Sequence, residues 1–405
     1  MKKIIIGVGL ILLFLNLTGC KKNVLPQRKE INDLQLVQVI GIDKLPGDTN
    51  DCLLTVASKN LETGGGQDSS GNTSGSTGVS SEKALILSAS GKTIFDAARN
   101  IQTHSNKTIF WGHTDYYLIG EDAARDNIAK FIDFFTRDHE LRIESKVFIV
   151  KGSTAKELME QLNQSKYYII DKLESLERNF ELLSNSQDLK IHELMRFIDI
   201  HHSSARIPCI YLINRDSGNK EQVKDIESCG YAIISNLKLV GFIDKSISRG
   251  VNLITNTVGS SIVTVKDPDG NDVSLEIINS NTEVIPHFSG DDLESITLKT
   301  KVTSNIGELQ SQTDFTDEKS ILYMESQQSE ILKNEMQSSL EKIIESKSDC
   351  LGICDRIRLK RPLKWRKIEG KWMDIFTNIK FDIEVVSKIE RTYELKELSG
   401  YKGKE

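Results

Sequence analysis

Apolar residues recur at helical spacing in two stretches of the first third of the chain. The stretch 90–106 predicts an amphipathic helix with Ser90 as its N-cap residue, and the stretch 121–138 predicts a second helix. Runs rich in strand formers at 116–119 and 147–150 alternate with these helices. The apolar positions are Ile94, Ala97, Ala98 and Ile101 in the first helix, and Ala124, Ile128, Phe131, Ile132 and Phe135 in the second. This alternation predicts a layered α/β or α+β domain.

The rest of the chain is mainly strand-like, with two further helical regions. Residues 34–43 and 52–59 predict a hairpin, and the helix predicted at 321–344 would turn Leu322, Met336 and Leu340 inward. Other strands are predicted at 84–88, 231–234, 239–243, 274–278, 296–302 and 379–389, and a helical region at 157–202. We therefore predict an α+β protein of about three domains, with mixed or antiparallel sheets packed by helices. These are an N-terminal domain over 34–215, a middle β-rich domain over 216–285 and a C-terminal α/β domain over 286–405.

The N-terminus has the pattern of a lipoprotein signal peptide. Lys2 and Lys3 precede an uncharged apolar run at 4–17, which is shorter than the roughly 20 residues of a membrane-spanning helix. The run ends in LTGC, the pattern of a bacterial lipobox, so we expect a signal peptide over 1–19, lipidation of Cys20 and a lipidated tether over 20–33. The alternative is an ordinary signal peptide with an incidental cysteine. The lipidated form would be membrane-anchored and extracytoplasmic.

The stretch 62–81 consists almost entirely of Gly, Ser, Thr and Asn. Such a composition offers almost no apolar surface to bury, so it predicts a flexible loop. Because strand-like sequence resumes directly after it, we place this loop inside the N-terminal domain.

Charge and cysteine content narrow the function classes. The 405 residues carry 52 Lys and Arg against 58 Asp and Glu, and this acidic balance gives no support for nucleic-acid binding. Six cysteines include Cys20, and the odd number that remains fits no disulfide framework. Cys350 and Cys354 are the one close pair. They could form a bridge outside the cytoplasm, but we expect buried free thiols.

No motif indicates catalysis, a metal or a cofactor. Gly91-Lys92-Thr93 resembles the end of a phosphate-binding loop, but Ile86 stands where that loop needs a glycine, so helix capping is the better interpretation. His104 and His113 flank a polar turn and His201 and His202 are adjacent, which is not the spacing of a metal site. No Gly-x-Ser-x-Gly sequence or cysteine signature indicates a nucleophile. We therefore predict no catalytic, cofactor-binding or metal-binding residues and no enzyme activity.

Two charged segments are candidates for partner contact. Asp133, Arg137, Asp138 and Glu140 cluster at a predicted helix end, where local ion pairs on a solvated surface are the simpler interpretation. The segment 356–371, which we call the basic segment, carries eight Lys and Arg against Glu369 alone. It is either a solvated face or a surface for acidic partners or lipid head groups.

Three pieces of the N-terminal half carry a resemblance to a known family: SASGKTIFDAARN, FWGHTDYYLIGEDAARDNIAKFIDFFTRD and VFIVKG. They resemble the Ger(x)C family of bacterial endospore lipoproteins. The glycines Gly230, Gly241 and Gly250, and later Pro362, Trp365, Trp372 and Phe376, extend the likeness over nearly the whole chain. None of these pieces is a catalytic motif, and it is their order and spacing that carry the resemblance.

The resemblance implies a C subunit of a nutrient germinant receptor that acts in spore germination. Its partners would be the integral membrane A and B subunits, and its lipid anchor would hold it on the outer face of the spore inner membrane. It would act by assembly and without a cofactor. The rival hypothesis is an extracytoplasmic solute-binding lipoprotein, which would show two similar α/β lobes. A tethered enzyme is a third class, but no motif supports it.

Overall fold

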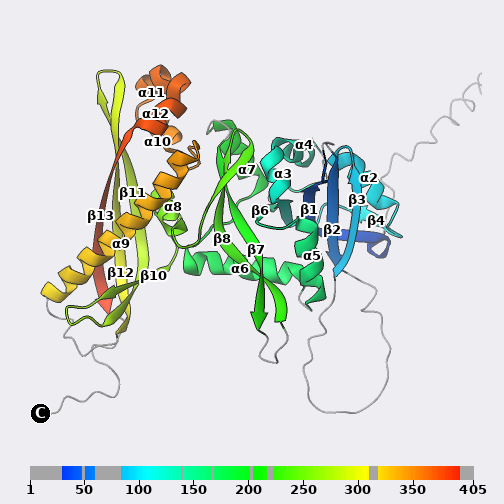
Figure 1. Ribbon diagram of the computed structural model, residues 1–405, viewed down its shortest axis with the longest axis horizontal. Coiled ribbons are helices and arrows are strands. Elements are labelled where there is room, and N and C mark those ends of the chain that lie inside the picture. Colours follow the sequence, from blue (N-terminus) through cyan, green and yellow to red (C-terminus); the bar gives the residue numbers. More distant parts are fainter. Residues whose placement is uncertain are drawn as a thin grey trace, which may run out of the picture.

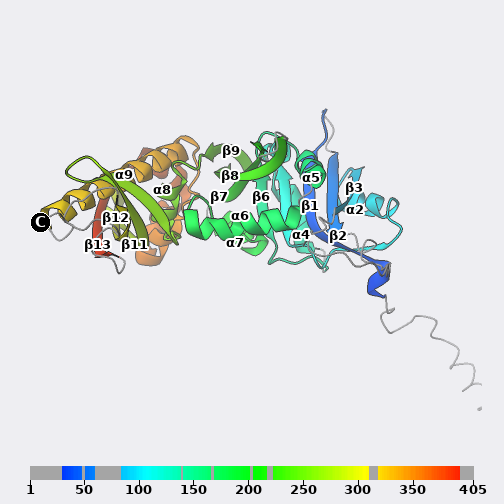
Figure 2. The same cartoon turned by 90° about the horizontal axis from the view of Figure 1, so that it is seen from below.

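The computed structural model describes residues 30–47, 51–59, 84–137, 140–165, 168–200, 204–216, 222–309 and 318–392. Two β-sheets lie toward opposite ends of an elongated molecule, and helices pack on both (Figures 1 and 2). The predicted α+β architecture, with mixed sheets packed by helices, is confirmed. The predicted signal peptide, Cys20 and the Gly/Ser loop at 62–81 lie outside the described residues. Among the described helices, none has the length and apolar character needed to span a membrane.

The first sheet has the strand order β3-β2-β1-β5-β6-β7-β8-β9, with β4 beside β1. Its middle strands β1, β5, β6 and β7 run parallel, whereas β1–β2–β3 and β7–β8–β9 are antiparallel. The hairpin predicted from residues 34–59 is the β1–β2 pair. The strands are β1 (Leu34–Lys44), β2 (Cys52–Lys59), β3 (Ala84–Gly91), β4 (Thr108–Phe110), β5 (Tyr116–Gly120), β6 (Lys146–Val150), β7 (Ala205–Asp216), β8 (Gln222–Ser235) and β9 (Lys238–Ile243).

Among the described residues, six α-helices and a short 3-10 helix accompany the first sheet. They are η2 (Ile31–Asp33), α2 (Ile94–Gln102), α3 (Glu121–Asp126), α4 (Ala129–Arg137), α5 (Ala155–Gln164), α6 (Ile169–Leu183) and α7 (Ile191–Ile200). The apolar face predicted for α2 is the buried one, with Ile94, Ala97, Ala98 and Ile101 in the core. This confirms that the helical spacing in this stretch reflects burial against the sheet.

Two local predictions are wrong at helix boundaries. Thr93, and not Ser90, caps α2 by accepting a hydrogen bond from the Asp96 amide, because β3 continues through Ser90 to Gly91. The single helix expected over 121–138 is divided into α3 and α4. It breaks at Asn127, whose backbone is extended, and the next amide, that of Ile128, donates to the Leu237 carbonyl.

The second sheet has the order β10-β11-β12-β13. Its first three strands are antiparallel, and β13 returns parallel to β12 after a helical crossover. The elements are α8 (Ser248–Thr255), β10 (Ser261–Lys266), β11 (Asp272–Ser289), β12 (Asp292–Leu309), α9 (Glu318–Glu345), α10 (Ile353–Lys360), α11 (Pro362–Ile368), η4 (Glu369–Lys371), α12 (Trp372–Asn378) and β13 (Lys380–Thr392). The long helix α9 lies across this sheet (Figure 1).

Polar residues replace part of the expected apolar face of α9. Leu322, predicted inward, is 56% exposed, whereas Gln328 is buried and donates to Ser304 Oγ at 2.8 Å. Gly250 explains why α8 can cross α9 closely, since a Cβ there would lie 2.4 Å from the Glu335 carbonyl oxygen. Met336 and Leu340 are buried as predicted.

Strand β8 connects the two halves of the molecule. Ala232 and Ile234 belong to the core of the first sheet, whereas Tyr231 and Ile233, on the opposite face, belong to the core that includes the second sheet. The boundary expected between residues 215 and 216 falls at the end of β7, and the first sheet continues beyond it through β8 and β9. The two halves therefore share a strand.

Candidate functional site: an apolar groove beside the first strand

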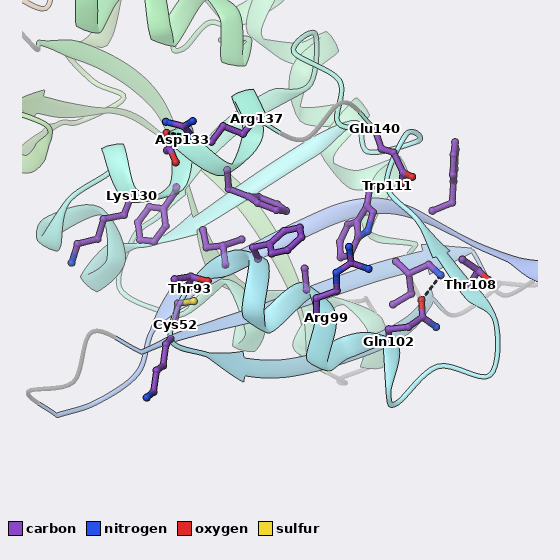
Figure 3. A pocket seen from close by; sticks show the side chains of 18 of the residues that line it. Cys52, Thr93, Arg99, Gln102, Thr108, Trp111, Lys130, Asp133, Arg137 and Glu140 are labelled. Atoms are coloured by element: carbon purple, nitrogen blue, oxygen red, sulfur yellow. Dashed lines mark hydrogen bonds and ion pairs between the residues drawn. The ribbon is translucent and has the colours of Figure 1, made fainter. Parts of the chain in front are cut away.

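A groove of about 1240 Å³ lies between α2, β4, α4 and the start of β1 (Figure 3). Leu34, the first residue of β1, lies on its wall. Gln102 of α2 stabilises one side by accepting a hydrogen bond from the Ile109 amide at 3.0 Å and donating one to the Lys107 carbonyl at 2.8 Å. The groove is therefore formed by elements that are hydrogen-bonded to one another.

Aromatic and aliphatic side chains form most of the groove surface. Phe95 is 51% exposed although it lies on a helix whose other large apolar residues are buried. Its ring centroid lies 6.3 Å from that of Phe134 on α4, and the Arg99 guanidinium lies 4.9 Å above it. The apolar lining residues are Leu34, Ile94, Phe95, Ala98, Ile109, Phe110, Trp111, Phe131 and Phe134. Exposed aromatic surface of this kind is typical of a contact site for another molecule.

The rim of the groove is positively charged. Arg137 pairs with Asp133 at 2.7 Å, and Lys130 pairs with Asp126 at 2.6 Å. By contrast, the Lys92 and Arg99 side chains have no carboxylate within 4.0 Å among the described residues. The predicted local ion pair of Asp133 and Arg137 is thus present, although Asp138 lies outside the described residues. An acidic group in the groove could therefore pair with these two cations.

The other sequence candidates are dispersed. Lys92 and Thr93 belong to the cap of α2, as the capping interpretation predicted, with the Lys92 amide donating to Asp96 Oδ2 at 3.0 Å. His104 and His113 lie in turns, and His201 and His202 are outside the described residues. In the described ranges, no group of three His, Cys, Asp or Glu side chains could hold a metal ion.

One pair of cysteines forms a disulfide that the cysteine spacing did not predict. Cys209 and Cys229 form a disulfide between β7 and β8, with their Cα atoms 5.3 Å apart. A bulge in the β7–β8 register leaves Cys229 unpaired in the ladder beside Cys209, which brings the two side chains together. Cys350 and Cys354 are buried free thiols, as expected. The spacing along the chain gives no sign of the bridge because strand register, a non-local property, creates it.

Several cationic side chains of the basic segment interact with other residues of this chain. Lys360 pairs with Glu283 at 2.7 Å and Lys367 with Asp291 at 2.6 Å, both on the β11–β12 hairpin. Arg358 pairs with Asp355, and Lys364 lies 4.7 Å from the Phe288 ring centroid. Arg361, Arg366 and Lys371 have no ion pair among the described residues. The segment is neither fully solvated nor a free basic patch.

Sequence reasoning did not identify the groove. Phe95 was the available signal, because it lies outside the apolar face of α2 and is still a large aromatic residue. Phe110 and Trp111 carry no periodic pattern, so only the packing of β4 against β1 brings them to the same surface.

Comparisons with known proteins agree with the resemblance. Residues 27–212 match the spore germination protein N-terminal domain, and residues 229–393 match the family described as spore germination B3/GerAC like, C-terminal. Spore germination protein KC of Bacillus subtilis (strain 168) is 22% identical over 411 residues, covering 96% of this chain and 96% of that protein. Spore germination protein B3 of the same organism is 25% identical over 309 residues, covering 75% of this chain and 79% of that protein.

The fold has a solved relative. The crystal structure of the GerBC protein aligns with 86% of this chain and 96% of its own, with a TM-score of 0.54 and 19% sequence identity. The two modules, in this order and on this fold, define a spore germination protein. The chain belongs to the spore germination B3/GerAC-like family, so the resemblance to the Ger(x)C family is confirmed.

Proposed function

We propose that this protein is the membrane-anchored lipoprotein subunit of a nutrient germinant receptor, and that it acts by assembly with the integral membrane A and B subunits. The observation that carries this proposal is the match to both family modules in order, extended by a relative that covers 96% of the chain. The anchor would be the acylated Cys20, placing the protein on the outer face of the spore inner membrane. No step of catalysis is needed for this role.

The disulfide supports an extracytoplasmic location. Structural disulfides persist in oxidising compartments and are rare in the cytosol. The Cys209–Cys229 bridge lies in the first sheet, with both cysteines buried in its core. Export through a lipoprotein signal would deliver the chain to a compartment that permits this bridge.

The groove is our candidate for the contact with the membrane subunits. The described chain begins at Glu30, and η2, β4 and α2 lie at the same end of the long axis (Figures 1 and 2). An anchor attached through residues 20–33 would hold this end nearest the membrane. The occupant would be an apolar segment of a membrane subunit carrying an acidic side chain, since aromatic walls and the unpaired Lys92 and Arg99 favour that chemistry.

The anchor is tested by Cys20→Ala. Without the thiol no acyl chain can be attached, so the variant should leave the membrane fraction and should no longer co-purify with the A and B subunits. Two acyl chains hold a protein firmly because each buried methylene contributes about 0.8 kcal/mol. The control replaces residues 1–20 with a membrane-spanning helix, which should restore both properties. Normal membrane fractionation of Cys20→Ala would reject the anchor, and failure of the control to restore co-purification would show that Cys20 does more than tether.

The groove is tested separately by Phe95→Glu. Because Phe95 is half exposed, the variant should keep its melting temperature, whereas its co-purification with the membrane subunits should fall about tenfold, as for an interface hot spot. The matched control is Ile143→Glu, a change at an equally exposed apolar residue (50%) away from the groove. If Phe95→Glu and Ile143→Glu co-purify equal amounts of the membrane subunits, the contact with these subunits lies outside the groove.

The rival function, solute capture, is less well supported. That class would have two similar α/β lobes, but the halves here have different sheets, one mixed with parallel middle strands and one mainly antiparallel. The assembly role is therefore preferred.

A further inference from the structure

A second pocket, of about 300 Å³, lies where the two halves meet. Its walls come from α7 and β7, from the end of α8, and from the start of α10. Three arginines line it: Arg196 on α7, Arg206 on β7 and Arg356 on α10. The pocket is thus built from segments that are far apart in the sequence, and it is separate from the groove.

Arg206 is held in place by a backbone carbonyl and two aromatic rings. The residue is only 9% exposed, and its Nη1 donates to the Cys350 carbonyl at 3.0 Å. The guanidinium carbon lies 5.8 Å from the Phe197 ring centroid and 5.9 Å from that of Tyr231. A guanidinium has five N–H donors in a fixed fork. The carbonyl and the two rings fix its position and leave donors available to the pocket.

Arg356 is also held by a backbone carbonyl. Its Nη1 donates to the Ile254 carbonyl at 2.7 Å. Burial lowers the pKa of Arg356 and the positive charge of Arg206 lowers it further, whereas the carboxylates of Asp349 and Asp355 raise it. Two partly or fully buried cations facing each other are unfavourable unless an anion compensates them.

Asp188, Glu193 and Asp355 also line the pocket, and each of them interacts with a residue outside it. Asp355 pairs with Arg358, Asp188 lies 3.9 Å from Lys146, and Glu193 accepts from the Lys190 amide at 3.0 Å. The buried Asp349 accepts from two backbone amides and from the Trp372 indole. Consequently none of the three arginines has a carboxylate within 4.0 Å in the part of the chain that the structure describes.

We propose that this pocket binds a small soluble oxyanion, a carboxylate or phosphate group, between Arg206 and Arg356, with Arg196 at its mouth. Planar guanidinium groups bind such anions through paired N–H···O hydrogen bonds. A volume of about 300 Å³ is at the lower end for ligand pockets, which suits a compact ion and excludes a peptide chain. A bound anion would remove the repulsion between the two arginines and would connect β7 to α10.

The experiment measures thermal unfolding and calorimetric binding of the full soluble chain, residues 21–405, with inorganic phosphate and with succinate. Potassium chloride at matched ionic strength controls for screening. Ligands that bind only the folded state raise the melting temperature with concentration. We expect at least one of the two probes to do so beyond the chloride control, and the one that does identifies the anion class.

Arg356→Gln should weaken binding at least tenfold. The exposed Arg196→Gln, which has no described partner to lose, should weaken it several-fold without affecting the fold. Arg361→Gln is the matched control: it is an exposed residue at the end of the same helix and outside the pocket, and its binding should equal that of the wild type. If Arg356→Gln does not fold, Arg196→Gln decides. No stabilisation beyond that by chloride, or equal binding by Arg196→Gln and Arg361→Gln, would overturn the proposal.

Discussion

Asp349 is the residue on which the packing of the C-terminal helices depends most directly. Its carboxylate accepts hydrogen bonds from the Ile353 amide at 3.0 Å, the Cys354 amide at 2.8 Å and the Trp372 indole at 2.9 Å. Gly352, the N-cap residue of α10, has no side chain to cap the helix, so Asp349 satisfies these amides in its place. Burial raises the pKa of the Asp349 carboxyl, and the donors that surround it act in the opposite direction.

Asp349→Asn should therefore be strongly destabilising although the shape hardly changes. The amide group has one acceptor oxygen, and its NH2 would face buried donors, each of which costs about 1–3 kcal/mol when left unsatisfied. We expect a loss of about 2 kcal/mol or more in urea unfolding. The control Asp355→Asn removes only a partly exposed ion pair to Arg358, of a kind that contributes about 1 kcal/mol or less. Similar losses for both variants would show that Asp349 is not the organising group.

At the scale of single elements, the β7–β8 hairpin is the most strongly constrained. It carries the Cys209–Cys229 bridge, and Gly230 beside it has a φ of 93°. A Cβ at Gly230 would lie 2.2 Å from the Ile243 carbonyl oxygen, so only glycine allows β9 to approach β8 at this point. The bridge and the glycine together fix how β7, β8 and β9 align.

Replacing both bridge cysteines by alanine should destabilise the protein by about 3 kcal/mol, the size expected for a loop of this length. Guanidinium unfolding with and without dithiothreitol provides the measurement, and the reductant should affect the wild type but not the double variant. Cys52→Ala, which removes a buried free thiol of the same sheet, should retain the sensitivity to reductant. If dithiothreitol does not change the guanidinium unfolding of the wild type, the bridge does not stabilise the protein.

The basic segment provides a further test at this scale. Reversing Lys360 and Lys367 to Glu would place like charges beside Glu283 and Asp291 on the β11–β12 hairpin, so the melting temperature should fall. Reversing Arg361, Arg366 and Lys371, which have no ion pair among the described residues, should leave it nearly unchanged. Both variants change several charges in one segment, so a general charge effect would lower the two melting temperatures alike.

Features that depend on neighbouring residues in the sequence could be predicted, whereas features that depend on strand pairing could not. The face of α2 follows from the spacing of Ile94 to Ile101, and Trp365, Trp372 and Phe376 could be expected in the core because large aromatic rings bury the most surface. The N-cap residue of α2 could not be predicted, because Ser90 and Thr93 are both good N-cap residues. Only the pairing of β3 with β2 decides between them.

Neither the groove nor the second pocket could be predicted from the sequence, because each is formed by residues that only tertiary contacts bring together. Phe95 and Trp111 meet only because β4 adds to β1, and Arg206 meets Arg356 only because the two halves join. In α9, Gln328 is buried because Ser304 on β12 offers it a partner, which no periodicity within the helix indicates. Such contacts depend on sheet register and crossover, not on sequence spacing.

At the scale of the whole molecule, the shared strand β8 makes the two halves one thermodynamic unit. Tyr231 and Ile233 pack on one core while Ala232 and Ile234 pack on the other, so neither core is complete without the strand. The contact is reinforced by Ser348, which donates to the Ile234 carbonyl at 2.7 Å. Separate unfolding of the halves would require one of them to lose β8.

We therefore expect a single unfolding transition. In a Trp111→Phe variant, the remaining tryptophans, Trp365 and Trp372, report fluorescence from the second half only. Far-ultraviolet circular dichroism reports both halves, and its midpoint in urea should coincide with that of the fluorescence. The same comparison on the double cysteine variant is the useful control, because weakening β8 without separating the halves should lower both midpoints together. Two distinct midpoints in the Trp111→Phe variant would show that the halves unfold independently.

The position of β8 in the sheet also has a consequence for biosynthesis. During synthesis, β1 to β7 emerge before residues 222–243, so the first sheet must wait with β7 as an open edge. An unpaired strand edge offers its backbone groups to any other chain nearby. The interval before β8 and β9 arrive is thus a time at which this protein is exposed to aggregation, and a chaperone that covers the β7 edge during this interval would reduce that risk.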